Sequence, residues 1–228
     1  MWMEWIELQN NYEKIVDTIP STVTLVAVSK YQPSEAVEVL YRLGHRVFGE
    51  SHVQELSKKH ELLPQDIQWH FIGHLQTNKV KYIAPYISMI ESVDSAKLYE
   101  EINKQASKCN RIIDVLLELH IAQEETKYGL TPEECRDLLR SNVFSSCKNV
   151  RVRGLMTIAS NVDDEQQIQK EFQLASDTFQ AIKSEFFSNN PWFNCCSWGM
   201  SSDYPLAIIH GSNMVRVGTS IFGARQYK

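Results

Sequence analysis

Short, densely apolar runs alternate along the chain with longer segments in which apolar residues recur every three or four positions. Runs this short and this apolar are typical of strands that are buried on both faces, as in a parallel sheet. Eight such runs are present: TLVAVS from Thr24, RVFGE from Arg46, WHFIG from Trp69, SMIESV from Ser88, DVLLELH from Asp114, RGLMTI from Arg153, CSWGM from Cys196 and MVRVG from Met214. The pattern therefore predicts strands separated by helices.

The segments between the strands have helical periodicity and recognisable helix ends. Two carry a single apolar face, formed by Ile168, Phe172, Phe179, Ile182 and Phe186 in one and by Leu98, Ile102, Ala106 and Cys109 in the other. Thr131 and Glu134 make a capping box, and Gly211 is placed to end a short helix. The opening segment MWMEWIELQNNYEKI is predicted to form an amphipathic helix.

The order of these elements favours a closed barrel. No linker rich in Pro, Gly or Ser interrupts the chain, so residues 1–228 are expected to form a single domain. The pattern predicts an α/β fold, a (β/α)8 TIM barrel with an additional N-terminal helix, and the alternative is an open doubly wound sheet. In a barrel the strand ends share one rim, where active sites form. The residues that would meet there are Lys30, Glu50, Gly73, Met156, Met200 and Gly218.

Composition and charge exclude several classes of protein. The formal net charge is -5 and the basic residues are scattered, which argues against a nucleic-acid partner. No segment approaches the roughly 18 apolar residues of a membrane helix, and the N-terminus lacks the features of a secretory signal. The five cysteines show no paired CxxC spacing, so we expect reduced thiols, no metal site and a cytoplasmic location.

One lysine stands out chemically. Lys30 ends the run LVAVSK, which places a primary amine at the tip of an otherwise apolar strand. A partly desolvated amine loses some of its preference for the charged form, and the neutral amine is the nucleophile. The segments GMSSD at 199–203 and VRVGTSIFG at 215–223 supply hydroxyls and backbone N–H groups suited to a phosphate. Together they indicate pyridoxal 5′-phosphate (PLP), whereas Lys30 alone would more simply be a surface lysine.

Several ordered motifs extend this interpretation over nearly the whole chain. They are LVAVSK, FGES followed by VQE, WHFIGHLQTNK, KYGL, RGLMTIA, GMSSDYPLAI and GSNMVRVGTSIFGAR. In these motifs the chain resembles the pyridoxal phosphate homeostasis proteins, whose fold is that of the alanine racemase N-terminal barrel. One position departs from the family, which commonly has asparagine after FGE where this chain has Ser51. Ser51 would replace an amide contact to the cofactor by a shorter hydroxyl.

The resemblance implies roles for the lysine and for the residues near the C-terminus. Lys30 would form an internal aldimine with the cofactor aldehyde, and Ser201, Gly218 and Thr219 would bind the phosphate. Ser201 and Ser202 precede a predicted helix, so their N–H groups and hydroxyls can face an anion. Ordinary capping of that helix is the alternative for the serines.

Other residues could either contact the cofactor or have a purely structural role. By resemblance, Arg216 would face the pyridine nitrogen, where a permanent cation keeps that nitrogen unprotonated. The alternative pairs Arg216 with a barrel carboxylate such as Glu50 or Glu118. Met156 would pack beside the cofactor ring or would fill the core. A structural role is expected for three histidines, His70, His74 and His210.

Three functions are compatible with such a site. A PLP-dependent amino-acid racemase-like enzyme needs acid/base groups on both faces of the cofactor. Because only five residues follow Gly223, we expect no C-terminal domain to supply the second group. A direct Schiff-base aldolase would use Lys30 on its substrate. The resemblance favours a PLP carrier in an open site, without robust turnover. We predict this carrier to be monomeric and cytoplasmic, with PLP-dependent apoenzymes as candidate transient partners.

Overall fold

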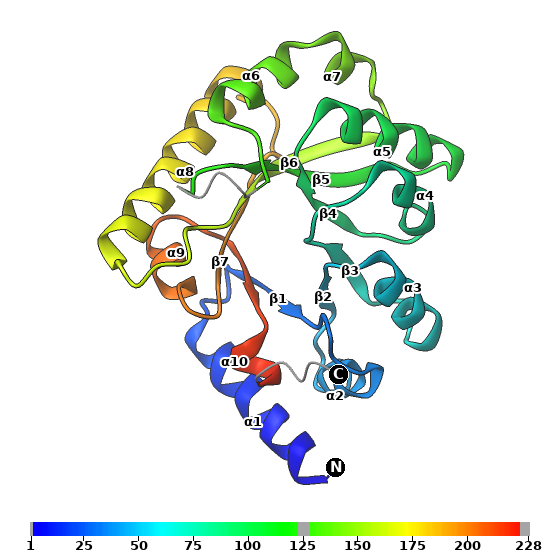
Figure 1. Ribbon diagram of the computed structural model, residues 1–228, viewed down its shortest axis with the longest axis vertical. Helices are drawn as coiled ribbons and strands as arrows, with labels where there is room; N and C mark the ends of the chain where they lie inside the picture. The colour runs from blue at the N-terminus through cyan, green and yellow to red at the C-terminus, as the bar shows by residue number, and fades with distance from the viewer. Residues whose placement is uncertain (1, 123–127, 224–228) are drawn as a thin grey trace.

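The computed structural model describes residues 2–122 and 128–223, in which eight parallel strands close into a barrel (Figure 1). Each strand pairs with its neighbours in sequence. The barrel is closed by the pairing of the first strand with the last, in which Val26 lies opposite Arg216. The predicted barrel is therefore confirmed. The open doubly wound sheet is wrong, because an open sheet has two edge strands, whereas each of these eight strands pairs on both sides.

All eight predicted strands are present in the described part of the chain. They are β1 Thr24–Val28, β2 Val47–Glu50, β3 Gln68–Phe71, β4 Met89–Val93, β5 Ile113–Leu119, β6 Val150–Thr157, β7 Cys195–Met200 and β8 Met214–Val217. The start of β6 differs most from its prediction, because the strand begins at Val150 and not at Arg153. Arg151 and Arg153 lie 2.6 Å and 2.7 Å from the Asp114 carboxylate of β5, and these ion pairs accommodate two charged residues in the strand.

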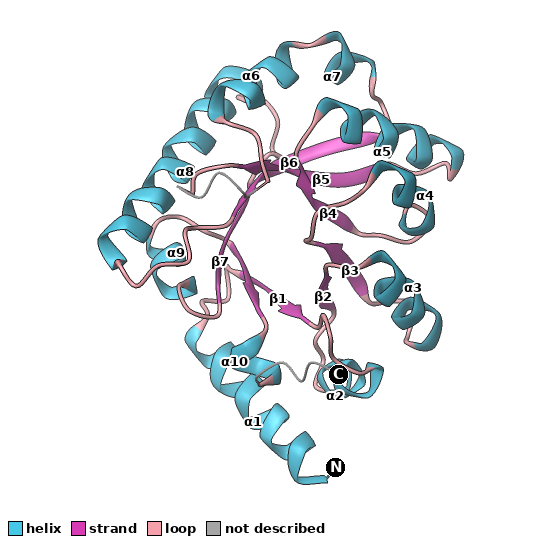
Figure 2. Ribbon diagram, in the orientation of Figure 1, coloured by secondary structure: helices cyan, strands magenta, loops and turns pink. Residues whose placement is uncertain are grey.

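Helices surround the barrel on its outer side (Figure 2). They are α1 Trp2–Thr18, α2 Ser34–Arg42, α3 Val53–Leu62, α4 Val80–Ile83, α5 Ala96–Lys108, α6 Pro132–Arg140, α7 Asn142–Ser146, α8 Glu165–Phe186, α9 Tyr204–Ile209 and α10 Thr219–Phe222, with a 3-10 turn η1 at Thr77–Lys79. The additional N-terminal helix α1 packs against α2 and α10. The predicted capping box is formed at α6, where the Glu134 N–H donates to the Thr131 hydroxyl at 3.2 Å.

The core has two parts. The larger fills the layer between strands and helices and includes the fully buried Trp69 and Trp198. The smaller lies inside the barrel and consists of Val26, Met89, Leu116, Met156, Cys195 and Met214. Glu91, Ser197 and Arg216 each follow a member of this smaller cluster by two positions, so they face the same interior. A polar layer therefore lies between the apolar barrel interior and the rim.

The described helices include none that is long and apolar enough to span a membrane. Among the same residues, no three His, Cys, Asp or Glu side chains are gathered as they would be around a metal ion. The five cysteines are free thiols, and four of them are buried.

Candidate functional site

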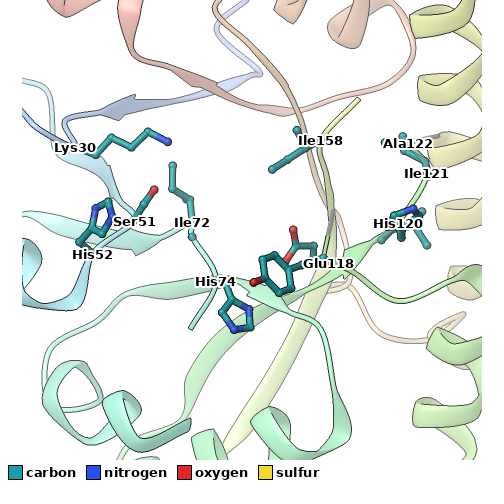
Figure 3. A pocket seen from close by; sticks show the side chains of 13 residues that line it. Lys30, Ser51, His52, Ile72, His74, Glu118, His120, Ile121, Ala122 and Ile158 are labelled. Atoms are coloured by element: carbon teal, nitrogen blue, oxygen red, sulfur yellow. The ribbon is translucent and has the colours of Figure 1, made fainter. Parts of the chain in front are cut away.

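A cavity of about 510 Å³ opens at the rim formed by the strand ends (Figure 3). Small-molecule sites typically have volumes of about 300–1,000 Å³. The lining residues are Lys30, Ser51, His52, Ile72, Gly73, His74, Glu118, Leu119, His120, Ile121, Ala122, Tyr128 and Ile158. Lys30 enters from the β1 side and Glu118 from the β5 side (Figure 3). Lys127, the first residue of the KYGL motif, lies outside the described residues.

The backbone on both sides of Lys30 is held by two side chains of α3. The Lys59 Nζ donates to the carbonyl oxygen of Ser29 at 2.7 Å, and the Glu55 Oε1 accepts from the N–H of Tyr31 at 2.7 Å. Lys59 and Glu55 also form an i,i+4 ion pair at 2.7 Å. Tyr31 has a left-handed backbone with φ 64°, which costs energy outside glycine. We call Glu55 and Lys59 the α3 clamp, because together they hold the segment that presents the amine.

Glu50 lies behind the α3 clamp, on the outer face of β2. Its Oε1 accepts from Ser29 Oγ at 2.6 Å and from Lys59 Nζ at 2.7 Å. Burial raises the pKa of Glu50 to about 7, although the Lys59 ammonium opposes this. The alternative that paired Glu50 with Arg216 is wrong, because alternation along β2 turns Gly49 and not Glu50 into the barrel.

The predicted phosphate residues lie at the ends of β7 and β8. The Ser201 Oγ accepts from the N–H of Gly218 at 3.1 Å and from that of Ser220 at 3.5 Å. Gly218 lies close to β1, since a Cβ added to it would stand 3.2 Å from the carbonyl oxygen of Val28. Val28 precedes Lys30 by two residues. These hydroxyl and N–H donors therefore share one part of the rim with the lysine.

The other four predicted cofactor residues lie at different positions between the exposed rim and the barrel interior. Thr219 and Ser202 are exposed at the rim, at the start of α10 and before α9. Ser51 lines the cavity and packs on Gly73, where an added Cβ would come within 2.7 Å of the Ser51 Cβ. Met156 is completely buried in the barrel interior and is not among the described residues that line the cavity. The structure thus brings Ser51 to the cavity wall and leaves Met156 in the core.

Arg216 lies inside the barrel with a side chain that is 3% exposed. Its Nη1 donates to the Ser197 carbonyl oxygen at 2.8 Å and to the Ser197 Oγ at 2.6 Å, and its Nη2 donates to the Thr157 carbonyl oxygen at 2.8 Å. The carboxylate in ion-pair range is that of Glu91, 3.9 Å away. Burial lowers the pKa of Arg216, and the charges of Glu91 and Glu118 oppose this. Glu118 therefore acts on Arg216 through charge, without an ion-pair contact.

Glu91 connects Arg216 to the other side of the barrel interior. Its Oε1 lies 2.7 Å from His70 Nδ1, and its Oε2 accepts from Ser197 Oγ at 2.6 Å. Burial tends to raise the pKa of Glu91, but the hydrogen bond and charge of His70 and the charge of Arg216 hold the pKa below its ordinary value. The predicted structural role of His70 is confirmed. Sequence reasoning missed Glu91, which is the one charged residue of the predicted strand SMIESV.

The β5 side of the cavity combines a carboxyl group with aromatic rings. Glu118 is 7% exposed, and burial raises its pKa to about 7, with the nearby Asp94 reinforcing and Arg216 opposing the shift. The His74 Nδ1 lies 3.1 Å from the Asp94 carboxylate. The His74 ring also stacks on Tyr128, with centroids 3.9 Å apart. His74 therefore contributes to the cavity wall, beyond the structural role that the sequence predicts.

The donor set fits a ligand that carries an aldehyde and a phosphate. Lys30 offers a primary amine inside the cavity. Ser201 and the N–H groups of Gly218 and Ser220 converge at the rim beside β1. An amine suits an aldehyde carbon, and hydroxyl and N–H donors suit phosphate oxygens. The fold and the site together define a TIM-barrel protein with a lysine suited to a carbonyl cofactor such as PLP.

Comparison with known proteins identifies the family. The model for the alanine racemase N-terminal domain matches residues 6–226. The pyridoxal phosphate homeostasis protein of Aquifex aeolicus is 39% identical over 204 residues, which cover 89% of this chain and 87% of that protein. The pyridoxal phosphate homeostasis protein of Schizosaccharomyces pombe is 40% identical over 206 residues, which cover 89% of this chain and 84% of that protein. The chain therefore belongs to the pyridoxal phosphate homeostasis protein family, within the broader group that shares the alanine racemase N-terminal domain.

Solved structures agree with this assignment. PipY of Synechococcus elongatus, with PLP bound, is 32% identical and superposes with a TM-score of 0.84 over 95% of this chain and 100% of PipY. The alanine racemase of Bartonella henselae, with covalently bound pyridoxal phosphate, has a TM-score of 0.73 over 97% of this chain and 59% of the racemase. At 15% identity the likeness to the racemase shows the fold alone.

Proposed function

We propose that this protein binds PLP as a Schiff base on Lys30 and takes part in the intracellular homeostasis of that cofactor. The observation that carries the proposal is the position of the lysine, whose amine enters the cavity beside the strand tips that hold Ser201 and Gly218. Relatives named pyridoxal phosphate homeostasis protein support it, as does PipY, which was solved with PLP bound.

The rim residues have distinct roles in this proposal. Bound PLP supplies an electrophilic aldehyde and an electron-withdrawing ring. Lys30 captures the aldehyde, and the α3 clamp keeps the peptide groups on both sides of it in place. Ser201, Ser202 and Thr219 hold the phosphate, and Gly218 lets the backbone approach it while its N–H donates to the Ser201 hydroxyl. Ser51 contacts the cofactor from the cavity wall through its hydroxyl.

Arg216 and Met156 would act from the barrel interior, underneath the residues that line the cavity. We assign the Arg216 guanidinium to the pyridine nitrogen, where a cation that keeps its proton limits electron withdrawal by the ring. Glu91 and Ser197 orient that guanidinium. Met156 would act only indirectly, by packing in the interior cluster underneath the site. An arginine at the pyridine nitrogen favours holding the cofactor over stabilising carbanions.

We further propose that the protein is a carrier and regulator of PLP without robust turnover, and that it works as a cytoplasmic monomer. Neither a nucleic acid nor a membrane is expected as a partner, and PLP-dependent apoenzymes are the candidate transient recipients. The PLP-dependent racemase-like alternative is less supported, because the likeness to alanine racemases is one of fold. The names of the 34–40% identical relatives favour homeostasis.

The test is to trap the cofactor on its lysine. The protein is incubated with PLP, its visible absorbance spectrum is recorded, and borohydride reduction is followed by peptide mass mapping. We expect a visible band and a reduced pyridoxyl group on Lys30. Lys30→Ala should lose both, whereas Lys81→Ala, at an exposed lysine of α4, should keep both. A wild-type protein that stays colourless and unlabelled would refute PLP binding, and rapid racemisation of alanine would refute the carrier assignment.

The phosphate donors give a separate prediction. Ser201→Ala removes the hydroxyl that joins the ends of β7 and β8. We expect it to weaken PLP retention at least about tenfold, equivalent to about 1.4 kcal/mol, measured by equilibrium dialysis. Ser107→Ala, at an exposed position of α5, is the matched control and should retain PLP normally. Unchanged retention in Ser201→Ala would remove this serine from the phosphate site.

A further inference from the structure

The cavity continues from Lys30 to the β5 side of the barrel. Its lining there includes Glu118 and Tyr128, whereas the described residues that line it do not include Ser201 or Gly218. The β5 end is therefore distinct from the phosphate donors at the tips of β7 and β8. The proposed PLP site gives no role to the groups at that end.

Glu118 is the unusual group at the β5 end. Its side chain is almost completely buried and turned toward the cavity (Figure 3). Among the described residues, no side chain or backbone group donates a hydrogen bond to its carboxyl group. The Glu118 oxygens are not among the fully enclosed side-chain atoms that lack a partner, so they reach the cavity, where a largely desolvated carboxylate is costly until a ligand pairs with it. A ligand that brings a positive charge or N–H donors to Glu118 would remove that cost.

The charges around Glu118 favour a cation over an anion. Asp94 is a second carboxylate near it, and its influence on Glu118 is larger than that of Arg216. The Arg216 guanidinium is already engaged by Ser197, Thr157 and Glu91. Burial raises the pKa of Glu118 to about 7, with the charge of Asp94 adding to the shift, so the pocket as it stands disfavours the ionised carboxylate.

The surrounding walls limit the rest of such a ligand to a small apolar body. Apolar side chains line the cavity between Lys30 and Glu118 and beyond it: Ile72, Leu119, Ile121, Ala122 and Ile158. Tyr128 adds an aromatic ring, whose face attracts cations. A carboxylate beside an aromatic ring and aliphatic walls is suited to an ammonium group on a short alkyl chain.

We propose that the Glu118 end of the cavity is a binding subsite for small aliphatic primary amines, with the Glu118 carboxylate accepting hydrogen bonds from the ammonium group. The subsite is part of the same cavity as Lys30, so an amine held there lies within the space that the lysine amine enters. It consists of this chain's own residues and does not require PLP.

The test uses the full chain prepared free of cofactor, at pH 8, with n-propylamine as the probe. The ammonium of the probe persists at that pH because alkylamines lose their proton near pH 10.4. Two-dimensional amide NMR should show saturable shifts at Leu119 and Ile121, with a Kd on the order of 1 mM. Propionate and 1-propanol, of the same length, should bind at least about tenfold more weakly.

Variants distinguish the carboxylate from general cavity binding. Glu118→Gln keeps the size of the side chain and should weaken n-propylamine binding at least about tenfold, while its amide spectrum remains that of a folded protein. Glu38→Gln, at an exposed carboxylate of α2 paired with Arg42, should bind the amine like the wild type. Equal binding by wild type and Glu118→Gln, or equal binding of amine and alcohol, would overturn the subsite. Either result would leave the proposed PLP function intact, because no cofactor is present.

Discussion

Arg216→Met is expected to lower the free energy of unfolding by about 3–5 kcal/mol, measured by urea denaturation. The guanidinium is buried between the carbonyl oxygens of Ser197 and Thr157 and lies 3.9 Å from Glu91. A methionine fills most of the volume but removes the Arg216 cation, so the charge of the Glu91 carboxylate inside the barrel is offset less completely, with His70 left beside it. The loss comes mainly from that uncompensated charge, because a buried ion pair is worth little until one partner is removed.

A second substitution isolates the cause of this loss. Glu91→Gln in the Arg216→Met background removes the uncompensated charge and should restore part of the stability. Arg42→Met, which breaks an exposed pair with Glu38, is the control and should change stability by less than about 1 kcal/mol. If Arg216→Met costs as little as the control, or if the double variant recovers nothing, the buried charge does not account for the role of Arg216.

Glu118→Gln is expected to change the free energy of unfolding in a way that depends on pH. Relative to wild type, the variant should be up to about 3 kcal/mol more stable at alkaline pH than it is at pH 4. Burial raises the folded-state pKa of Glu118 from 4.5 to about 7, a difference of about 2.5. Each unit corresponds to about 1.4 kcal/mol. Because the folded state holds the proton more tightly, the wild type loses stability as pH rises from about 4.5 to about 7 and changes little above that. Glutamine does not titrate, so it avoids this loss.

The measurement is a pair of urea denaturation series at pH 4, 6 and 8. The difference between Glu118→Gln and wild type should grow with pH and level off above pH 7. Glu38→Gln again serves as the control, with a difference that stays within about 0.5 kcal/mol over the same range. A difference between Glu118→Gln and wild type that is independent of pH would mean that the carboxyl group is solvated in the folded protein.

The barrel was predictable because its strands are buried on both faces, which leaves a continuous apolar signal in the sequence. The signal failed at the start of β6, where Arg151 interrupts the apolar residues and the strand was predicted to begin only at Arg153. Both arginines form ion pairs with the one carboxylate of Asp114 on the neighbouring strand. These ion pairs depend on the register between β5 and β6, so they cannot be predicted from the sequence of one strand.

Some residues of the site could likewise be predicted from short sequence motifs, whereas others are recognised only from contacts between distant strands. Lys30 and Ser201 stand in short motifs at strand ends, so their approximate places could be predicted from alternation and topology. The bonds of Glu91 to His70 and Ser197 join β4 to β3 and β7, and they exist only once the barrel has closed. The expectation that Arg216 faces the cofactor nitrogen stays a prediction, whereas its ion-pair partner could be found only from the structure.

The α3 clamp has a consequence for protein engineering. Lys30 is presented by a turn whose flanking peptide groups are fastened to Glu55 and Lys59 of a separate helix. A reactive lysine grafted onto the first strand of another barrel would be attached by its own backbone alone, free to adopt other turn conformations. The transferable unit is therefore a strand end together with the helix after the next strand, carrying an acid and a base one turn apart.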